Sequence, residues 1–190
     1  MMEDIVLVGF GGHAKSVADC IELQGKYHIV GYTDTEDKHV RYDFLGSDSE
    51  LPSLFNVGIK YAAVGIGYMG RSLLREQIYN NLKQIGFLLP VIIDPSAIIS
   101  KTATIQEGTL VGKGAIVNAG AVIGKMVIVN THALVEHECI LGDFVHVAVG
   151  AILCGQVEIG RAAFIGANST IIQCKKINAG TLIPAGTVVR

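Results

Sequence analysis

The 190-residue sequence has no tryptophan, only four prolines and a nearly balanced charge. Its 15 Lys and Arg residues face 17 Asp and Glu residues, so it lacks the basic excess with which proteins bind a nucleic-acid backbone. It also lacks an apolar run long enough for a membrane-spanning helix, and its first residues, Met-Met-Glu-Asp, are acidic rather than basic as in a signal peptide. We therefore expect neither a nucleic-acid partner nor a membrane span.

The four cysteines lack the short regular spacing of zinc ligands. They are Cys20, Cys139, Cys154 and Cys174. Reduced thiols are typical of proteins in a reducing compartment, so we expect a cytoplasmic protein with no metal ion.

An aliphatic residue recurs at every sixth position in the second half of the chain. These residues, the first place of each hexad, are Ile93, Ile99, Ile105, Val111, Val117, Ile123, Val129, Val135, Leu141, Val147, Leu153, Ile159, Ile165, Ile171, Ile177, Ile183 and Val189. A small residue usually follows four places later, and Lys175 is the clear exception. A period of six fits neither an amphipathic helix nor a simple alternating strand, but it is typical of parallel β-helices.

The hexads resemble those of left-handed parallel β-helices, in which three hexads make one triangular coil of 18 residues. We therefore predict such a β-helix for residues 93–190. Stacked coils pair as parallel strands, so residues 18 apart should be about 4.8 Å apart on one corner or one face.

Residues 1–92 show the pattern of a small α/β domain. Apolar runs at 4–9, 28–33 and 61–65 predict parallel strands, and helices are expected from the loop after the first strand to about residue 24 and over 71–85. Strands that alternate with helices in this way predict a Rossmann-like parallel sheet.

The first loop of this domain matches the G-x-G-x-x-A pattern of nucleotide-binding proteins. The matching residues are Gly9, Gly11 and Ala14, and Asp34 follows the next predicted strand. Glycines there let backbone N–H groups approach a pyrophosphate, and an acidic residue can bind a ribose hydroxyl. A domain of this size holds one mononucleotide half of the fold, which favours a nucleotide joined to a smaller group. The alternative is a tight turn that binds nothing.

Several segments are similar to one family of bacterial enzymes. They are Gly-Phe-Gly-Gly-His-Ala-Lys at 9–15, Gly-Tyr-Thr-Asp at 31–34, Ala-Val-Gly-Ile-Gly at 63–67, Asp-Pro-Ser-Ala at 94–97, and Asn-Thr-His-Ala-Leu-Val-Glu-His-Glu-Cys-Ile-Leu-Gly-Asp-Phe-Val-His at 130–146. The chain thereby resembles the hexapeptide-repeat sugar acetyltransferases grouped as sialic-acid O-acetyltransferases and UDP-4-amino-sugar N-acetyltransferases. It departs from them at Asp94, where a histidine is common, and in lacking their Gly-Val-Pro-Ala-Lys type of tail after Arg190.

The resemblance implies an α/β domain that binds the sugar nucleotide, a β-helix that binds acetyl-CoA, and a homotrimer that acts in surface-glycan or glycoconjugate biosynthesis. It implies that His137 is the catalytic base and that Glu138 tunes it. We expect the nucleotide sugar to contact Gly9, Gly11, Gly12, His13, Asp34, Gly65 and Asn130, and acetyl-CoA to contact His146, Gly155, Ala167 and Ala185.

The hexads also predict which residues stack on the outside of the coils. Gly or Asn often occupies the second place, as in Gly112, Asn118, Gly124, Asn130, Gly142, Gly160, Gly166 and Asn178, and we interpret these as turn residues with φ > 0. The third place is then an outward corner, and one corner stacks Lys101, Ala119, His137, Gly155 and Gln173. Either Glu136 or Glu138 could hold the His137 ring, and Gly155 could offer its N–H to the thioester oxygen. The role of His146 stays open between a site residue and interface packing, whereas His132 is expected to be a structural or exposed turn residue.

Two of the three outward faces are apolar. The Ile152 face consists of Ile98, Ile116, Leu134, Ile152, Thr170 and Val188, and the His146 face consists of Leu110, Ile128, His146, Phe164 and Leu182. A monomer would leave both faces exposed, so the sequence itself predicts a closed three-fold assembly.

These observations predict an acetyl-CoA-dependent acetyltransferase that acts on a nucleotide-activated amino sugar. Because no Cys or Ser occupies the His137 corner, we expect direct attack in a ternary complex. O-acetylation of sialic acid or a related sugar is an alternative. Other classes are a β-helical carbonic anhydrase, for which His132 and His137 have a suitable spacing but a third upstream histidine is missing, and a non-catalytic scaffold. The sequence leaves the sugar and the nucleotide open.

Overall fold

The structure is a computed structural model that describes residues 2–67 and 73–190. Contacts divide the chain into two compact units, the first with residues up to Gly67 and Leu73–Ile92, and the second with Ile93–Arg190. No helix in the described part of the chain has both the length and the apolar character needed to cross a membrane.

The first unit is built on a three-stranded parallel sheet. Strand β1 (Glu3–Val8) lies between β2 (Tyr27–Thr33) and β3 (Tyr61–Val64). The second half of β1 is fully buried, as expected for the central strand of a parallel sheet. The helices are α1 (Gly12–Gln24), α2 (Leu51–Asn56) and α3 (Leu74–Ile85), with a 3₁₀ turn η1 (Asp48–Glu50) before α2. The α/β expectation for this unit is therefore confirmed.

Glycines end two of these helices. Gly25 after α1 has φ 67° and Gly86 after α3 has φ 114°, the left-handed conformation that closes a helix at low cost when no Cβ is present. The sequence pattern did not predict α2 or η1. The first residues of the predicted 71–85 helix lie partly outside the described residues, and α3 begins at Leu74.

The second unit is a parallel β-solenoid of two-residue strands. They are β4 (Ile92–Ile93), β5 (Ile98–Ile99), β6 (Thr104–Ile105), β7 (Leu110–Val111), β8 (Ile116–Val117), β9 (Val122–Ile123), β10 (Ile128–Val129), β11 (Leu134–Val135), β12 (Ile140–Leu141), β13 (His146–Val147), β14 (Ile152–Leu153), β15 (Glu158–Ile159), β16 (Phe164–Ile165), β17 (Thr170–Ile171), β18 (Lys176–Ile177), β19 (Leu182–Ile183) and β20 (Val188–Val189).

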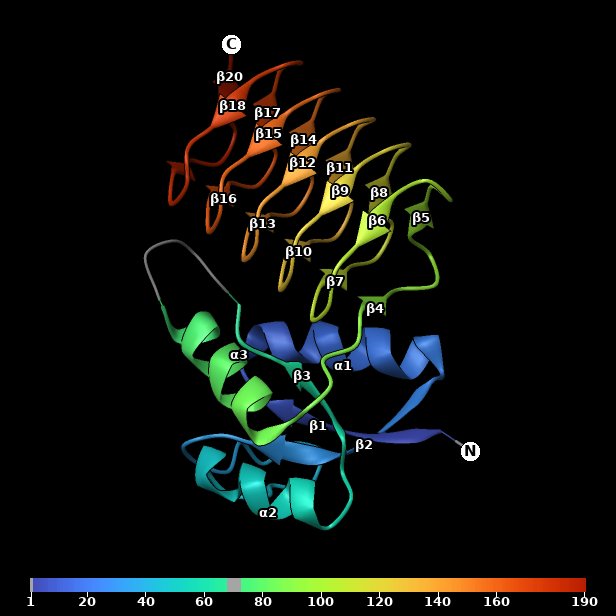
Figure 1. The fold of residues 1–190 in the computed structure, drawn as a ribbon, viewed down its shortest axis with the longest axis vertical. Helices are drawn as coiled ribbons and strands as arrows, with labels where there is room; N and C mark the ends of the chain where they lie inside the picture. Colours follow the sequence, from blue (N-terminus) through green and yellow to red (C-terminus); the bar gives the residue numbers. More distant parts are fainter. Residues whose placement is uncertain (1, 68–72) are drawn as a thin grey trace. The chain divides into compact units, whose positions relative to one another are not determined.

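Every third strand stacks into the same sheet, which makes three sheets along the solenoid (Figure 1). The pairs Ile128↔His146, Leu134↔Ile152 and Ile140↔Glu158 each join residues 18 apart. The 18-residue register confirms the predicted hexapeptide β-helix.

The first and fifth places of the hexads form the core of the solenoid. Val129 and Ala133, for example, are fully buried, and the same holds for Val135 and Cys139. Each fully buried aliphatic side chain stabilises the fold by about 1.5–3 kcal/mol. The small fifth-place residues leave room for the large first-place residues, which explains the two linked periodicities of the sequence.

The prediction of φ > 0 at the second place is wrong. Positive φ angles occur at the fourth place instead, in Gly108, Gly114, Gly120, Met126, His132, Glu138, Phe144, Gly150, Gln156, Ala162, Asn168, Cys174, Gly180 and Gly186. The second-place glycines meet a different need, because a Cβ on Gly124 would lie 2.8 Å from the backbone nitrogen of Asp143. A Cβ on Gly142 would lie 2.7 Å from the backbone nitrogen of Arg161. Glycine is used there because the next coil passes close by.

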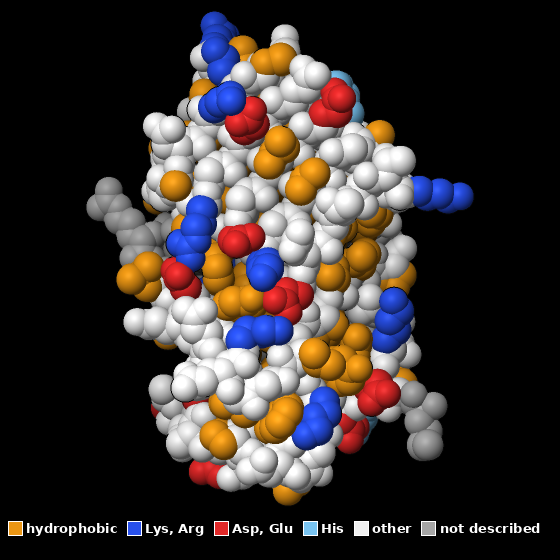
Figure 2. Space-filling view, viewed as in Figure 1, with side chains coloured by type: hydrophobic (Ala, Val, Ile, Leu, Met, Phe, Trp, Pro, Cys, Tyr) orange, Lys and Arg blue, Asp and Glu red, His pale blue; other side chains and the backbone are white. Residues whose placement is uncertain are grey.

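The prediction that both apolar faces are exposed in one chain is correct only in part: the Ile152 face is exposed at Ile98, Ile152 and Val188 and half-buried at its other positions. Ile98 is 63% exposed and Val188 54% exposed on that face. On the His146 face, Leu110, Ile128 and His146 are 6%, 0% and 7% exposed within the single chain, whereas Leu182 remains 46% exposed. Figure 2 shows charged side chains of both signs among hydrophobic ones on the viewed side.

Candidate active site

His137 lies on an outward corner of the solenoid, two residues after β11, and its side chain is exposed. The residue one coil further on is Gly155, which has no positive φ and so no backbone need for glycine. A Cβ there would lie 2.5 Å from both Cε1 and Nε2 of His137. The imidazole therefore occupies the space that a side chain at position 155 would fill.

Two carboxylates contact His137 in different ways. Glu138 Oε2 lies 3.4 Å from Nδ1 of the ring, a long hydrogen bond of the kind often seen before substrates bind. Glu136 Oε2 accepts the backbone N–H of His137 at 3.0 Å, and its Oε1 accepts Asn118 Nδ2 at 2.9 Å. Of the two glutamates that the sequence left open, Glu138 faces the ring and Glu136 holds the backbone.

The geometry at this corner fits a histidine that acts as a base. A hydrogen bond from Nδ1–H to Glu138 leaves the lone pair on Nε2, the atom next to Gly155. Among the residues that the structure describes, no acceptor pairs with the backbone N–H of Gly155. A base and a hydrogen-bond donor therefore lie side by side at one corner.

His146 and Asn130 form a second cluster on the His146 face. Asn130 Oδ1 accepts the N–H of Thr131 at 2.8 Å, so its Nδ2 faces His146 Nε2 at 3.2 Å. Because an amide nitrogen only donates, Nε2 of His146 accepts and the ring proton is on Nδ1. The ring also packs edge-on against Phe164, with centroids 5.1 Å apart. His146 and Asn130, predicted to contact acetyl-CoA and the sugar, thus bind each other in the structure.

The other predicted acetyl-CoA residues follow the 18-residue spacing. Ala167 and Ala185 stack on one corner, joined by the hydrogen bond from the N–H of Gly186 to the carbonyl of Ala167 at 2.8 Å. Ala185 is exposed and Ala167 is half-buried. Ala167 and Ala185 therefore lie on a different corner of the triangular coil from His137 and Gly155.

In the first unit, two glycines of the predicted site are needed by the fold itself. Gly9 has φ 81°, and a Cβ there would lie 2.5 Å from Cγ1 of Ile66. A Cβ on Gly65 would lie 2.7 Å from the Cβ of Ala14 and would also overlap the carbonyl of Gly9. The end of β3 therefore packs directly against the loop after β1.

Gly11 and Gly12 differ from these glycines. Gly11 precedes α1 with φ −91°, Gly12 begins the helix, and a Cβ at either position would meet nothing within 4 Å. No side chain caps this end of α1, and its first turn contains no acidic residue. Open space in front of uncapped helix N–H groups is the arrangement that binds phosphate. His13 follows in the first turn and is half-buried.

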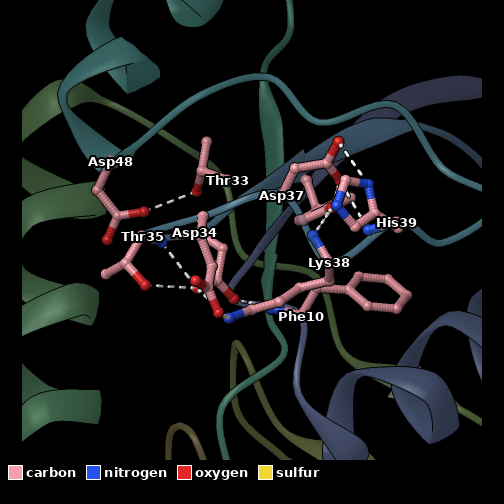
Figure 3. A network of polar contacts seen from close by, with 10 residues as sticks. Phe10, Thr33, Asp34, Thr35, Asp37, Lys38, His39 and Asp48 are labelled. Carbon is pink, nitrogen blue, oxygen red and sulfur yellow. Dashed lines mark hydrogen bonds and ion pairs between the residues drawn. The ribbon is translucent and has the colours of Figure 1, made fainter.

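Asp34, after β2, holds the loop in place (Figure 3). Its Oδ2 accepts the N–H of Phe10 at 2.8 Å, and its Oδ1 accepts the N–H of Thr35 at 2.7 Å. Lys38 Nζ lies 3.4 Å from Oδ1. Burial alone would raise the pKa of Asp34, but these hydrogen bonds and Lys38 lower it below its ordinary value. Asp34 therefore stays ionised, with most of its accepting capacity already used within the protein.

A cavity of about 350 Å³ lies beside this loop. Its lining includes Gly9, Asp34, Thr35, Ser47, Asp48, Ser49, Ile66, Leu74 and Ile78. Asp48 Oδ1 accepts the hydroxyl of Thr33 at 2.7 Å, so the end of β2 positions this carboxylate (Figure 3). Ser47, Asp48 and Ser49 were not among the predicted site residues, and their only signal in the sequence is a polar run directly before Leu51.

His132 is exposed at a fourth-place turn with φ 55°. Its ring lies over Gly114, where a Cβ would be 2.7 Å from Cε1. No group of three or more His, Cys, Asp or Glu side chains with metal-binding geometry occurs within residues 2–67 and 73–190.

Comparison with known proteins extends this picture. The family model for the PglD N-terminal domain matches residues 4–82. The structure superimposes on a single-residue variant of the GDP-perosamine N-acetyltransferase from Caulobacter crescentus, solved with CoA and GDP-perosamine, with a TM-score of 0.94 and 32% identity. That match covers 100% of this chain and 90% of the other.

A second similar structure is the acetyltransferase domain of PglB from Neisseria gonorrhoeae in complex with acetyl coenzyme A. It is 33% identical with a TM-score of 0.93, and the match covers 100% of this chain and 92% of that one. WeeI from Acinetobacter baumannii, at 18% identity, TM-score 0.64 and 96% coverage of both chains, shares the fold.

Two enzymes of one kind thus match the whole chain at 32–33% identity, and the amino-terminal family model agrees with them. The resemblance drawn from the sequence motifs is confirmed. This chain belongs to the hexapeptide-repeat sugar acetyltransferases and is an acyltransferase.

Proposed function

We propose that this enzyme transfers the acetyl group of acetyl-CoA to the amine of a nucleotide-activated amino sugar. The observation that carries the proposal is the His137 corner, where Glu138 faces Nδ1 and Gly155 leaves Nε2 uncovered. The similar structures support the choice of substrates, because one was solved with CoA and GDP-perosamine and another with acetyl coenzyme A.

In the proposed reaction, both substrates are bound at once and His137 is the general base. The amine nitrogen attacks the thioester carbon, Nε2 of His137 takes the amine proton, and the C–S bond breaks to release CoA thiolate, to which Nε2 then returns that proton. The backbone N–H of Gly155 would stabilise the oxygen that gains negative charge. Glu138 would keep the His137 proton on Nδ1 and stabilise the imidazolium that forms.

Direct transfer is supported by the state of the Cys139 thiol, two residues after His137. Cys139 is buried, its Sγ donates to the carbonyl of Cys154 at 3.1 Å, and burial raises the pKa of this thiol. A neutral buried thiol is a poor nucleophile, which argues against an acyl-cysteine intermediate at Cys139.

The nucleotide sugar is proposed to bind in the first unit. Gly11 and Gly12 leave the start of α1 open to the pyrophosphate, and the cavity beside Asp34 and Asp48 is large enough for a nucleoside. Asp34 would act mainly by holding the loop, since its oxygens already accept hydrogen bonds from Phe10 and Thr35.

The direct test is to mix the enzyme with acetyl-CoA and each of a panel of UDP-, GDP-, CMP- and TDP-linked amino sugars, and to measure release of free CoA. We expect turnover with at least one amino sugar and a product that resists hydroxylamine, because amides survive it and esters do not. A hydroxylamine-labile product on sialic acid would instead establish the O-acetyltransferase alternative. Failure of every sugar would contradict the proposal.

The same proposal places the enzyme in the cytoplasm, because acetyl-CoA and nucleotide sugars are made there. It also includes a homotrimer. The exposed Ile152 face supports assembly, because an apolar face of this kind is rarely left in water. A buried charge without a partner is costly, so Ile152→Asp should give a smaller particle in sedimentation with unchanged circular dichroism. A wild-type monomer in sedimentation would contradict the trimer.

A further inference from the structure

Gln156 lies one coil beyond Glu138 and makes one hydrogen bond to His137 and one to Glu138. Its backbone N–H donates to the carbonyl of His137 at 2.9 Å. Its side-chain Nε2 donates to Oε2 of Glu138 at 2.9 Å, and this is the same oxygen that faces Nδ1 of His137. The side chain of Gln156 therefore holds the carboxylate that faces the proposed base.

A third residue fixes the orientation of the Gln156 amide. Cys174 Sγ lies 3.3 Å from Oε1 of Gln156, and a thiol hydrogen can only be donated to that oxygen, not to an NH₂ group. The amide is then turned so that Nε2 faces Glu138. Glu138, Gln156 and Cys174 are 18 residues apart, occupy the same place in successive hexads and share φ angles of 58°, 59° and 61°. Their side chains consequently leave the backbone in the same direction and meet in a row.

In the part of the chain that the structure describes, no side chain of the preceding coil holds the Glu138 carboxylate. The residue at that place is Gly120, and a Cβ there would lie 3.5 Å from Cγ of Glu138. Among the described residues, the partners of the carboxylate are thus the His137 ring on one side and Gln156 on the other. A solvent-exposed glutamate with several rotatable bonds loses its orientation easily, so this single amide is its main restraint.

We infer that Gln156 is a positioning residue for the acetyl transfer, acting through Glu138 on the ring of His137, with Cys174 setting the direction of its amide. The inference rests on the proposed function, since it needs His137 as the base. Gln156 itself is not expected to touch either substrate.

The test compares kcat and KM of Gln156→Leu, His137→Ala and the control His132→Leu, using acetyl-CoA and the amino sugar that gives the fastest CoA release. His132 has the same kind of exposed, positive-φ turn position, so its leucine variant reproduces the backbone cost without disturbing the row. We expect Gln156→Leu to lower kcat about fivefold, the worth of one hydrogen bond, with both KM values unchanged. The control should keep wild-type kcat, and Cys174→Ala should lower kcat less than Gln156→Leu.

A second variant gives a readout that a purely structural role would not move. Gln156→Glu places a carboxylate beside Glu138, in surroundings that also contain His137, Glu136 and the thiol of Cys174. Added negative charge favours the imidazolium, so the acid limb of the kcat–pH profile should shift to higher pH.

The outcomes separate the two hypotheses. If His137→Ala keeps full turnover, the proposed base is wrong, and with it the role of Gln156. If His137→Ala is inactive while Gln156→Leu matches His132→Leu, or if Gln156→Glu leaves the pH profile unchanged, the inference about Gln156 alone is overturned.

Discussion

Glycines at the two proposed binding regions are present for opposite reasons. At position 155, the chain itself fills the space where a Cβ would be, because the His137 ring lies there. At positions 11 and 12 the chain leaves that space open. The fold explains Gly155, whereas no neighbouring atom among the described residues requires glycine at positions 11 and 12, which fits the proposed approach of a phosphate to α1. In the proposed site, Gly155 therefore makes room for the ring of the base, and Gly11 and Gly12 leave room for the nucleotide sugar.

The largest expected effect in this comparison comes from removing the ring that Gly155 accommodates. His137→Ala should reduce kcat by about 100-fold or more, the usual contribution of a positioned acid–base group. Acetyl-CoA should still bind, which calorimetry would show. Near-normal turnover at saturating substrates would mean that another group takes the proton.

Adding one methyl group should displace the same ring. In Gly155→Ala the new Cβ would lie 2.5 Å from Nε2 and Cε1, so the imidazole must rotate away. A reacting group that moves by about 1 Å can cost up to about 100-fold in rate, and we expect a loss of about tenfold or more in kcat. Gln173→Ala, one coil further along the same corner, is the matched control and should keep wild-type kcat. If Gly155→Ala and Gln173→Ala have equal kcat values, the position of the His137 ring against Gly155 is not needed for turnover.

A side chain in the open space of the first unit should affect only one substrate. Gly11 has an extended backbone that valine tolerates, so Gly11→Val should fold normally. Its isopropyl group would block the approach of phosphate to α1, and we expect KM for the nucleotide sugar to rise about tenfold or more while KM for acetyl-CoA is unchanged. A rise in both values, together with a lower melting temperature, would indicate a damaged fold instead.

The smallest expected effect concerns the cysteine next to Gly155. If transfer is direct, the half-buried thiol of Cys154 forms no bond to the acetyl group, so Cys154→Ala should keep kcat within about twofold. Rapid-quench experiments on the wild type should then show no acetyl group bound to the protein. An acetylated Cys154 peptide in mass spectrometry, with loss of turnover in the variant, would establish an acyl-enzyme route.

The sequence predicted the solenoid well because its physics is strictly repetitive. A first-place aliphatic residue and a fifth-place small residue must fill the same core in every coil, so the period of six could be interpreted without knowing any other contact. The 18-residue stacking followed, and with it the meeting of His137 with Gly155. The stacking of the His137 corner could therefore be predicted from residue numbers, whereas the proposed roles of His137 and Glu138 came from the resemblance to the acetyltransferases.

Other features escaped the sequence because one residue type serves several physical needs. Glycine at the second place suggested φ > 0, but it reflects the close approach of the next coil, as at Gly142 and Arg161. In the first unit, Ser47 and Asp48 line the cavity from the start of the short turn η1, which has no periodic sequence pattern. The hydrogen bond from Phe10 to Asp34 could not be foreseen either, since the sequence alone does not show how an acidic side chain divides its oxygens between ligand and loop.

The positive φ of Glu138 has a consequence for attempts to make this enzyme more heat-resistant. A non-glycine residue in this conformation lowers the free energy of unfolding by about 1 kcal/mol or more. Replacing such residues with glycine is therefore an obvious way to stabilise the protein. At Ala162 that exchange sacrifices a single methyl group. At Glu138 it would relax the backbone and also delete the carboxylate that faces His137, so under the proposed mechanism the more stable variant would have a lower kcat.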